Sequence, residues 1–213
     1  MLRVRHLLPF AALAALLGFS APGHTQTIID EWPSIKTPPV PELKVVAIDP
    51  KTTALVMLDF LPANCGARPR CIATLPAVKK LADEARTHGM TVIYTTFGKF
   101  TAADVLPDVA PRPSEPTITS TCDKFILGDK DTGLEKMLKD KGITTVITVG
   151  NTAICGVLYT AGAASLRGFN VIVPVDGVSS SDPYDEQSAL WTLANASVVS
   201  SKVTLTRISM INF

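Results

Sequence analysis

Four short apolar runs in the sequence have the pattern of strands that are buried on both faces of a sheet. They span residues 53–58, 90–95, 143–149 and 170–175, and a weaker run at residues 202–208 is a fifth candidate. Near-continuous apolar runs of this length are typical of parallel sheets, because helices cover both faces of such sheets. The pattern therefore predicts a mostly parallel sheet.

Segments with helical spacing separate these runs. Residues 75–88 carry leucine, valine and alanine at helical intervals and stop before Gly89, a residue type that commonly ends helices. Three further segments are predicted to be helical: residues 134–141, 155–166 and 184–194. Strands and helices that alternate with short glycine-containing connections indicate one doubly wound α/β domain with right-handed crossovers. In such a domain, ligands bind beyond the carboxyl ends of the strands.

Two segments depart from this alternation. Residues 32–41 are rich in proline and are expected to run extended over the surface. They belong to an N-terminal strap that consists of residues 26–52. Residues 101–121 form a loop rich in proline, serine and threonine that is long enough to cover a site. The sequence has no internal repeat and no interdomain linker, so residues 53–213 are predicted to form a single domain.

The N-terminus has the pattern of a secretory signal peptide, which we place at residues 1–25. Two arginines precede an uncharged apolar stretch at residues 7–17, and small residues suited to cleavage follow it. The stretch is shorter than the roughly 20 apolar residues of a membrane-spanning helix. An uncleaved N-terminal anchor is the alternative. We expect a secreted or periplasmic protein without a membrane partner after signal removal, in a compartment where disulfides persist.

Charge and histidine content narrow the candidate functions. The 213-residue chain has a net charge of +1, and removing residues 1–25 takes away two of the 20 basic residues and none of the 19 acidic ones, which gives −1. No basic stripe carries interleaved aromatics, so nucleic acid is not an expected partner. His6 and His24 both lie in the predicted signal peptide, which leaves His88 at the end of a predicted helix. A histidine base and a histidine-bound metal are therefore disfavoured, and no metal or other cofactor is expected.

Three chemically reactive side chains stand near the predicted strand ends. Asp59 directly follows the first strand, Lys124 follows the long loop, and Cys155 lies at the start of a helix after the third strand. A helix N-terminus and a nearby lysine both stabilise a thiolate, and a carboxylate supplies a base. Each residue also has a purely structural interpretation, because cysteines are often small buried hydrophobes, aspartates often cap turns and most lysines are solvated.

Four segments, in this order and spacing, resemble the isochorismatase-like cysteine hydrolase family. They are residues 53–60 (TALVMLDF), 124–134, 146–161 (VITVGNTAICGVLYTA) and 164–178 (ASLRGFNVIVPVDGV). The resemblance implies a three-layer α/β/α sandwich, a small-molecule substrate and a homo-oligomer. It also implies a catalytic triad of Asp59, Lys124 and Cys155.

The same resemblance implies a cis peptide bond between Gly150 and Asn151. With that geometry, the N–H groups of Asn151 and Cys155 would form an oxyanion hole. The sequence departs from the family pattern at two places nearby. Val149-Gly150 reverses the usual order of glycine and apolar residue, and Gly156 stands where valine is common.

The presence of the cysteine favours C–N bond hydrolysis, because the family members that hydrolyse isochorismate itself lack it. Residues 60–71 contain no histidine, so the metal site of the nicotinamidase branch is not expected. The predicted function is a metal-independent hydrolase of a small amide, ureido or imide substrate, acting through an acyl-enzyme on the cysteine. Phe60, Phe97 and Phe125 are candidates for lining its pocket, with core packing as the alternative. Two other functions remain open: a vinyl-ether or other non-amide hydrolase that does not use the thiol, and a catalytically silent binding protein on the same fold.

The remaining cysteines suggest disulfides rather than a metal site. Cys65 and Cys71 are six residues apart in one loop, and a local disulfide between them is expected in an exported protein. Cys122 lies two residues before Lys124 and could approach Cys155, where a disulfide would switch the enzyme off. Cysteines at these irregular spacings do not match a zinc site.

Overall fold

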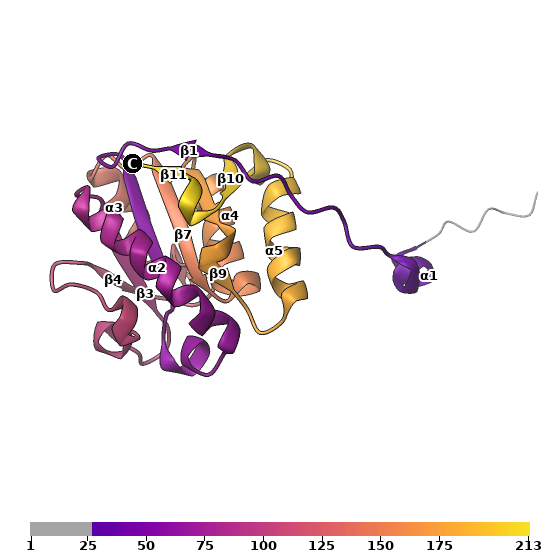
Figure 1. The fold of residues 1–213 in the computed structure, drawn as a ribbon, viewed down its shortest axis with the longest axis horizontal. Coiled ribbons are helices and arrows are strands. Elements are labelled where there is room, and N and C mark those ends of the chain that lie inside the picture. Colours follow the sequence, from indigo (N-terminus) through magenta and orange to yellow (C-terminus); the bar gives the residue numbers. More distant parts are fainter. Residues whose placement is uncertain (1–26) are drawn as a thin grey trace, which may run out of the picture. The chain divides into compact units, whose positions relative to one another are not determined.

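The structure is a computed structural model that describes residues 27–213. The signal peptide predicted for residues 1–25 lies outside the described residues. The described chain forms two units, residues 27–38 and residues 39–213, and the second contains the predicted domain (Figure 1).

A seven-stranded sheet forms the centre of the second unit. Its order is β10-β8-β7-β2-β3-β4, and the short strand β9 pairs with the end of β7. The strands are β2 (Thr53–Leu58), β3 (Thr91–Thr96), β4 (Thr117–Thr119), β7 (Thr145–Asn151), β8 (Asn170–Pro174), β9 (Val178–Ser179) and β10 (Val203–Thr206). All of these pairs are parallel, as the apolar runs predict.

The chain reverses its direction of travel across the sheet between β2 and β7. From β2 it proceeds outward through β3 to β4, and it then returns to the other side of β2 to form β7, β8 and β10. Leu58, the last residue of β2, pairs with Gly150 near the end of β7. The carboxyl ends of β2 and β7 thus form a topological switch point, the usual location of ligand sites in open α/β sheets.

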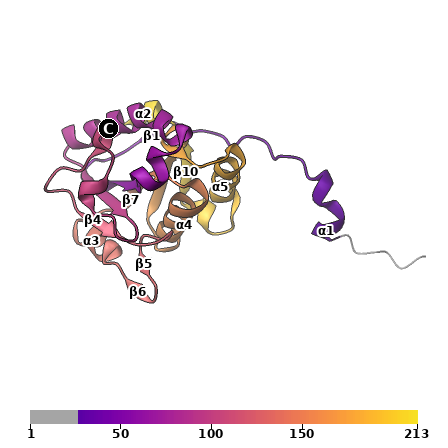
Figure 2. The same ribbon diagram turned by 90° about the horizontal axis from the view of Figure 1, so that it is seen from below.

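Helices cover both faces of the sheet, which confirms the α/β/α architecture. They are α2 (Pro69–Thr87) on one face, and α3 (Leu134–Asp140), α4 (Leu158–Leu166) and α5 (Pro183–Asn195) on the other. Strand β2 contributes to both cores: Leu55 and Met57 pack in the cluster around α2, whereas Val56 packs in the cluster around the other three helices. Figure 2 shows α2 and α4 on opposite sides of the sheet.

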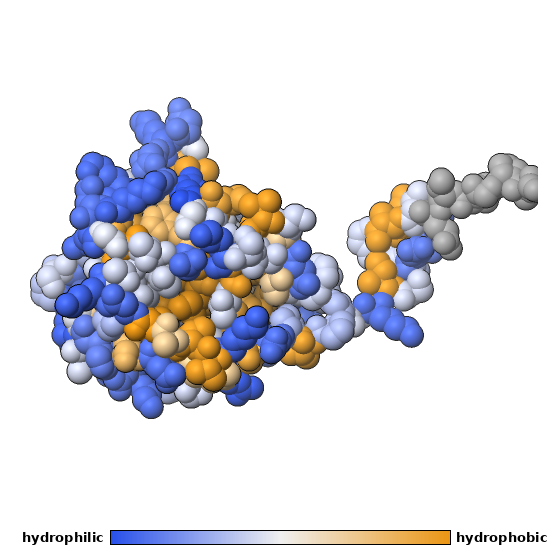
Figure 3. Space-filling model, turned by 90° about the horizontal axis from the view of Figure 1, so that it is seen from above, coloured by the Kyte–Doolittle hydropathy of each residue, from blue (hydrophilic) through white to orange (hydrophobic). Residues whose placement is uncertain are grey.

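The first unit is a short apolar segment. It contains helix α1 (Ile28–Glu31) and the 3₁₀ turn η1 (Trp32–Ser34). Its exposed apolar side chains are those of Ile28, Ile29, Trp32 and Ile35. Figure 3 shows hydrophobic surface on this segment. Among the helices of residues 27–213, none is long and apolar enough to cross a membrane.

Two helices begin elsewhere than their apolar spacing predicts. Helix α2 begins at Pro69 rather than at residue 75, because proline suits the first helical position, where an N–H would have no partner within the helix. The segment predicted to be helical from residue 155 starts with a π-helical turn, η5 (Ala153–Val157), and α4 follows it.

The long loop at residues 101–121 is partly regular structure. It contains the 3₁₀ turns η3 (Ala102–Asp104) and η4 (Pro107–Val109) and the edge strand β4. Val105 and Val109 are buried in the apolar cluster around α2. This part of the segment therefore packs on the core.

Residues 44–47 of the strap pair with the C-terminal segment of the chain. Strand β1 (Val46–Ala47) pairs in parallel with β11 (Ile211–Asn212). Nearby, the Lys44 N–H donates to the Leu205 carbonyl at 2.9 Å, and Thr206 Oγ1 donates to the Lys44 carbonyl at 2.6 Å. The remaining elements are η2 (Pro62–Gly66), β5 (Ile126–Leu127), β6 (Lys130–Asp131), η6 (Val175–Gly177), η7 (Val199–Ser201) and η8 (Ile208–Met210).

Gly150 allows β7 to approach β2 closely. Its φ is +138°, and a Cβ atom at this position would overlap the backbone oxygen of Leu58. We expect Gly150→Ala to lower the free energy of unfolding by about 3 kcal/mol or more, because the conformation and the overlap both disfavour a side chain. Gly142 is the control, since its φ is +69° and a Cβ there would meet no atom within 4 Å. For Gly142→Ala we expect a loss of about 1 kcal/mol in the same urea denaturation experiment, and equal losses would contradict the role of the contact.

Candidate active site

Asp59 occupies the turn that directly follows β2. Its φ is +53°, and its side chain is almost fully buried. Thr95 of β3 makes two hydrogen bonds with Asp59. Thr95 Oγ1 accepts one from the Asp59 N–H at 3.2 Å and donates the other to Asp59 Oδ1 at 2.7 Å. The second carboxylate oxygen, Oδ2, accepts a hydrogen bond from Lys124 Nζ at 2.7 Å. The carboxylate is therefore held in one orientation.

Lys124 is fully buried, and its main chain is fixed on both sides. Its N–H donates to Thr160 Oγ1 of α4 at 3.3 Å, and its carbonyl accepts a bond from Thr132 Oγ1 at 2.7 Å. The Thr160 hydroxyl also donates to the Cys122 carbonyl at 3.1 Å. Thr160 thus positions both the lysine and the neighbouring cysteine.

Burial shifts the pKa of both members of the Asp59–Lys124 pair. Loss of solvation raises the pKa of Asp59 above 3.8, against the charge and hydrogen bond of Lys124 and the hydrogen bond of Thr95. Loss of solvation lowers the pKa of Lys124 below 10.5, against the charge and hydrogen bond of Asp59. The carboxylate is therefore a stronger base than an exposed aspartate, as a proton acceptor in catalysis requires.

Cys155 lies in the turn η5, just beyond the end of β7. It is bonded to Cys122 in a disulfide, with the two Cα atoms 4.8 Å apart. Its N–H donates to the Thr152 carbonyl at 3.1 Å. The approach of Cys122 to Cys155 that the sequence suggested is therefore confirmed, and the sulfur of Cys155 is held in a covalent bond.

Gly156 brings this turn against the carboxylate of Asp59. A Cβ atom at this position would lie 3.7 Å from Asp59 Oδ2 and 3.3 Å from the Asn151 carbonyl oxygen. The second of these distances is a tight contact, so the larger side chain of valine would displace the Asn151 carbonyl or the turn. The departure from the family pattern at this position therefore has a packing reason.

The cis peptide bond joins Asn151 and Thr152, so the prediction of a cis bond between Gly150 and Asn151 is wrong by one residue. Strand β7 continues through Asn151, which pairs with Ser179 of β9, and Gly150 pairs with Leu58 of β2. Because both residues belong to the sheet, the bond between them keeps the trans geometry of a strand.

A cavity of about 360 Å³ opens at this edge of the sheet. It is lined by Asp59, Asn64, Arg68, Phe97, Gly98, Thr121, Cys122, Asn151, Thr152 and Cys155. Asp59 and Cys155 of the predicted triad thus line one cavity. Lys124 is outside the lining and contacts the Asp59 carboxylate. The volume lies in the range of small-molecule sites.

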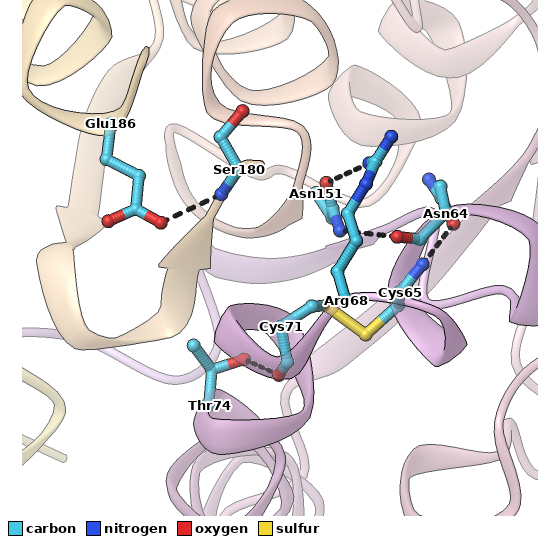
Figure 4. Close-up of a disulfide and its surroundings, with 8 residues drawn as sticks. All are labelled: Asn64, Cys65, Arg68, Cys71, Thr74, Asn151, Ser180 and Glu186. Carbon is cyan, nitrogen blue, oxygen red and sulfur yellow. Dashed lines mark hydrogen bonds between the residues drawn. A yellow bond between two sulfur atoms is a disulfide. The ribbon is translucent and has the colours of Figure 1, made fainter. Parts of the chain in front are cut away.

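A loop closed by a disulfide forms one wall of the cavity (Figure 4). Cys65 and Cys71 are bonded, with Cα atoms 5.1 Å apart, which confirms the predicted local disulfide. Asn151 Oδ1 accepts a hydrogen bond from Arg68 Nη1 at 3.2 Å, and Asn151 Nδ2 donates to the Asn64 carbonyl at 3.2 Å. These bonds tie the loop to the end of β7.

Phe97 lines the cavity, whereas Phe60 and Phe125 belong to the hydrophobic core. Phe60 packs in the cluster around α2. Phe125 packs against Phe169, with 6.4 Å between ring centres, and the Arg167 guanidinium lies 4.5 Å from its ring centre. The expectation that Phe60 and Phe125 line the substrate pocket is therefore corrected, because both rings are enclosed by other side chains.

Thr95, Asn64 and Arg68 are site residues that the sequence pattern did not reveal. The position of Thr95 in the site could have been predicted, because it lies near the end of β3, opposite Leu58 at the end of β2. Asn64 and Arg68 lie in an irregular loop without periodicity, so their distance from the strand ends could not be inferred. Only the folded loop brings them to Asn151.

His88 lies at the C-terminal end of α2, outside the lining of the cavity. Its Nδ1 contacts the Glu84 carbonyl at 2.9 Å, and its ring stacks on Phe213. Within residues 27–213, no group of three or more histidine, cysteine, aspartate or glutamate side chains is placed to hold a metal ion.

Comparison with known proteins supports the fold. The family model for the isochorismatase domain matches residues 53–203. Among curated proteins, no match was found. Similar solved structures include the N-carbamoylsarcosine amidase of Thermoplasma acidophilum (21% identity, TM-score 0.62, covering 74% of this chain and 96% of that one), the nicotinamidase of Staphylococcus aureus (18%, 0.64, 74% and 99%) and a cysteine hydrolase of Pseudomonas syringae pv. phaseolicola (17%, 0.66, 82% and 95%).

At these identities the structural likeness establishes the fold, and the family model establishes membership. The model spans most of the sheet, from β2 to the start of β10, and so includes the carboxylate, the lysine and the cysteine at the switch point. This chain therefore belongs to the isochorismatase-like hydrolase family.

Proposed function

We propose that this protein is a cysteine hydrolase that cleaves the C–N bond of a small amide, ureido or imide substrate without a metal. One observation supports this most strongly: the buried Asp59–Lys124 pair lies against the turn that carries Cys155, at a single cavity. Two of the similar structures, named as an N-carbamoylsarcosine amidase and a nicotinamidase, are amidases and so represent the same class of reaction.

In the first half of the proposed cycle, Asp59 accepts the proton of the reduced Cys155 thiol, and the thiolate attacks the substrate carbonyl carbon. The N–H groups of Thr152, which follows the cis bond, and of Cys155 bind the oxyanion, which requires the Cys155 N–H to leave or share its bond with the Thr152 carbonyl. The C–N bond then breaks as protonated Asp59 returns its proton to the leaving nitrogen. A thioester on Cys155 remains.

In the second half, Asp59 takes a proton from water while the water oxygen attacks the thioester. The carbon–sulfur bond breaks, the acid product leaves, and the Cys155 thiol is restored. Lys124 contacts Asp59 at 2.7 Å and is itself enclosed, so it keeps the base ionised and oriented without touching the substrate.

Export is part of the proposal. Disulfides persist in oxidising compartments, and the two disulfides of this chain, together with the predicted signal peptide, support a secreted or periplasmic location. In such a compartment, the redox state of the Cys122–Cys155 pair decides whether the nucleophile is available.

Hydrolysis of a panel of small amides, ureido compounds and imides tests the proposed function, with released ammonia measured for primary amides and ureido compounds and the amide acid measured for imides. We expect the reduced full-length protein to turn over at least one of these classes, and Cys155→Ala to lose all turnover. Mass spectrometry of quenched reactions should show a thioester adduct on Cys155. An equal thermal unfolding transition in Cys155→Ala serves as the folding control.

Two other outcomes would reject the proposed function. A fully active Cys155→Ala protein would indicate a hydrolase that does not use the thiol. An absence of turnover across the panel, with ligand binding unchanged in both Cys155→Ala and Asp59→Asn, would indicate a binding protein.

A further inference from the structure

Arg68 presents a positive charge to the cavity. Figure 4 shows its side chain extending from the start of α2 toward Asn151, to which Nη1 donates at 3.2 Å. Within residues 27–213, no carboxylate lies within 4.0 Å of its guanidinium. Arg70, two residues later, is by contrast paired with Glu186. Most of the donor groups of Arg68 are therefore free for a ligand.

The other charge at the cavity is already compensated. Asp59 and Arg68 are the charged residues of its lining, and the carboxylate of Asp59 is paired with the buried Lys124. The cavity as a whole thus carries an excess positive charge, at a volume of about 360 Å³ that suits a small molecule.

The backbone of Arg68 is fixed before any ligand binds. Its N–H donates to the Cys65 carbonyl at 2.9 Å, and its carbonyl accepts bonds from the N–H groups of Cys71 at 3.0 Å and Ile72 at 3.1 Å. The Cys65–Cys71 disulfide closes the same loop. Because the loop is held in this way, less conformational entropy is lost when the guanidinium binds an anion.

We propose that Arg68 binds a carboxylate of the substrate, so that the substrates are small acidic amides or ureido acids. The guanidinium presents paired N–H donors whose spacing matches the two oxygens of a carboxylate. This inference rests on the proposed cysteine hydrolase function, because it identifies the substrate class of that same site. Arg68 is then a specificity residue, and the C–N bond that reacts lies between its guanidinium and Cys155.

Alkylation of Cys155 by matched reagents tests the anion site without turnover. The full chain carrying Cys122→Ala leaves Cys155 free and keeps the Cys65–Cys71 disulfide. We compare iodoacetate with iodoacetamide, and 3-iodopropionate with its amide, and follow the labelling of Cys155 by mass spectrometry. Adding Arg68→Gln should lower the acid-to-amide rate ratio by about tenfold for at least one of the two pairs.

Two control variants separate charge recognition from a structural role. Arg70→Gln removes a neighbouring charge outside the cavity and should leave the ratio unchanged. Arg68→Lys keeps the charge and should retain part of the preference. If Arg68 only holds Asn151 in place, Arg68→Gln will slow the acid and the amide equally, and the unchanged ratio would overturn the inference.

Turnover gives a second, independent readout. On succinamate and its neutral diamide, Arg68→Gln should lower kcat/KM for the acid about tenfold more than kcat/KM for the diamide. If neither compound is hydrolysed but the alkylation ratio still depends on Arg68, the anion site stands and the proposed hydrolase function is in question. If both are hydrolysed equally well with and without Arg68, the function stands and the inference fails.

Discussion

Protein that retains both disulfides is expected to release no ammonia from amides, and reduction is expected to start turnover. The sulfur of Cys155 is bonded to Cys122, and a sulfur in a disulfide can neither lose a proton to Asp59 nor attack a carbonyl as a thiolate. Activity should therefore rise from background to its full value as this one bond is reduced.

The two disulfides should differ in their response to reductant. Cys65 and Cys71 have no exposed surface, whereas Cys122 and Cys155 line the cavity and can be reached by a small thiol. During titration with dithiothreitol, iodoacetamide should label Cys122 and Cys155 first. Ammonia release should rise with that labelling, as measured by mass spectrometry on alkylated aliquots and by a coupled assay on parallel aliquots that were not alkylated.

Cys122→Ala is the matched variant for this prediction. It removes the partner of Cys155 and should be active without reductant, whereas Cys155→Ala should stay inactive with it. If the oxidised protein is as active as the reduced one, or if Cys122→Ala still requires reductant, then the disulfide does not control the nucleophile.

Replacing either member of the buried ion pair is expected to reduce turnover strongly. Asp59→Asn removes the base and should lower kcat by about 10² to 10⁴. Lys124→Met should also lower kcat, because an unpaired carboxylate in this buried position takes up a proton and ceases to act as a base. An Asp59→Asn protein with unchanged kcat would show that another group accepts the thiol proton.

The same substitutions in the Asp59–Lys124 pair should affect the free energy of unfolding differently from turnover. Lys124→Met leaves a buried carboxylate without its partner and should cost about 3 to 5 kcal/mol in the free energy of unfolding. The double variant Asp59→Asn/Lys124→Met should recover much of that loss while staying inactive, because no buried charge remains. Lys136→Met, which removes one member of the exposed Lys136–Asp140 pair, is the control and should have little effect. Additive losses in the double variant would contradict this coupling.

The pKa shifts of Asp59 and Lys124 predict how turnover and stability depend on pH. Turnover should show a bell-shaped profile with its acid limb above 3.8, because the pKa of Asp59 is raised, and its alkaline limb below 10.5, because the pKa of Lys124 is lowered. A raised pKa means that the folded state binds more protons than the unfolded chain just above pH 3.8. The contribution of Asp59 to stability should therefore fall as the pH rises through that window, and Asp59→Asn should remove this slope.

The amino-acid sequence by itself determined the framework of the protein. The apolar run at residues 53–58 coincides with β2, since a strand covered on both faces needs an unbroken series of apolar side chains. Asp59 and Cys155 could be placed near each other because the carboxyl ends of parallel strands meet at one edge of a sheet. The Cys65–Cys71 disulfide could also be predicted, because its cysteines lie six positions apart in one loop.

Only the tertiary structure decided how the site is completed. Asp59 and Lys124 are 65 positions apart and Arg68 and Asn151 are 83 positions apart, so their contacts depend on how the loops pack and not on any local period. The same holds for Phe60 and Phe125, because hydrophobicity marks a side chain as buried without saying whether it faces a core or a cavity. Local pattern encodes burial and backbone conformation, whereas the direction of a loop side chain is set by the elements that surround it after folding.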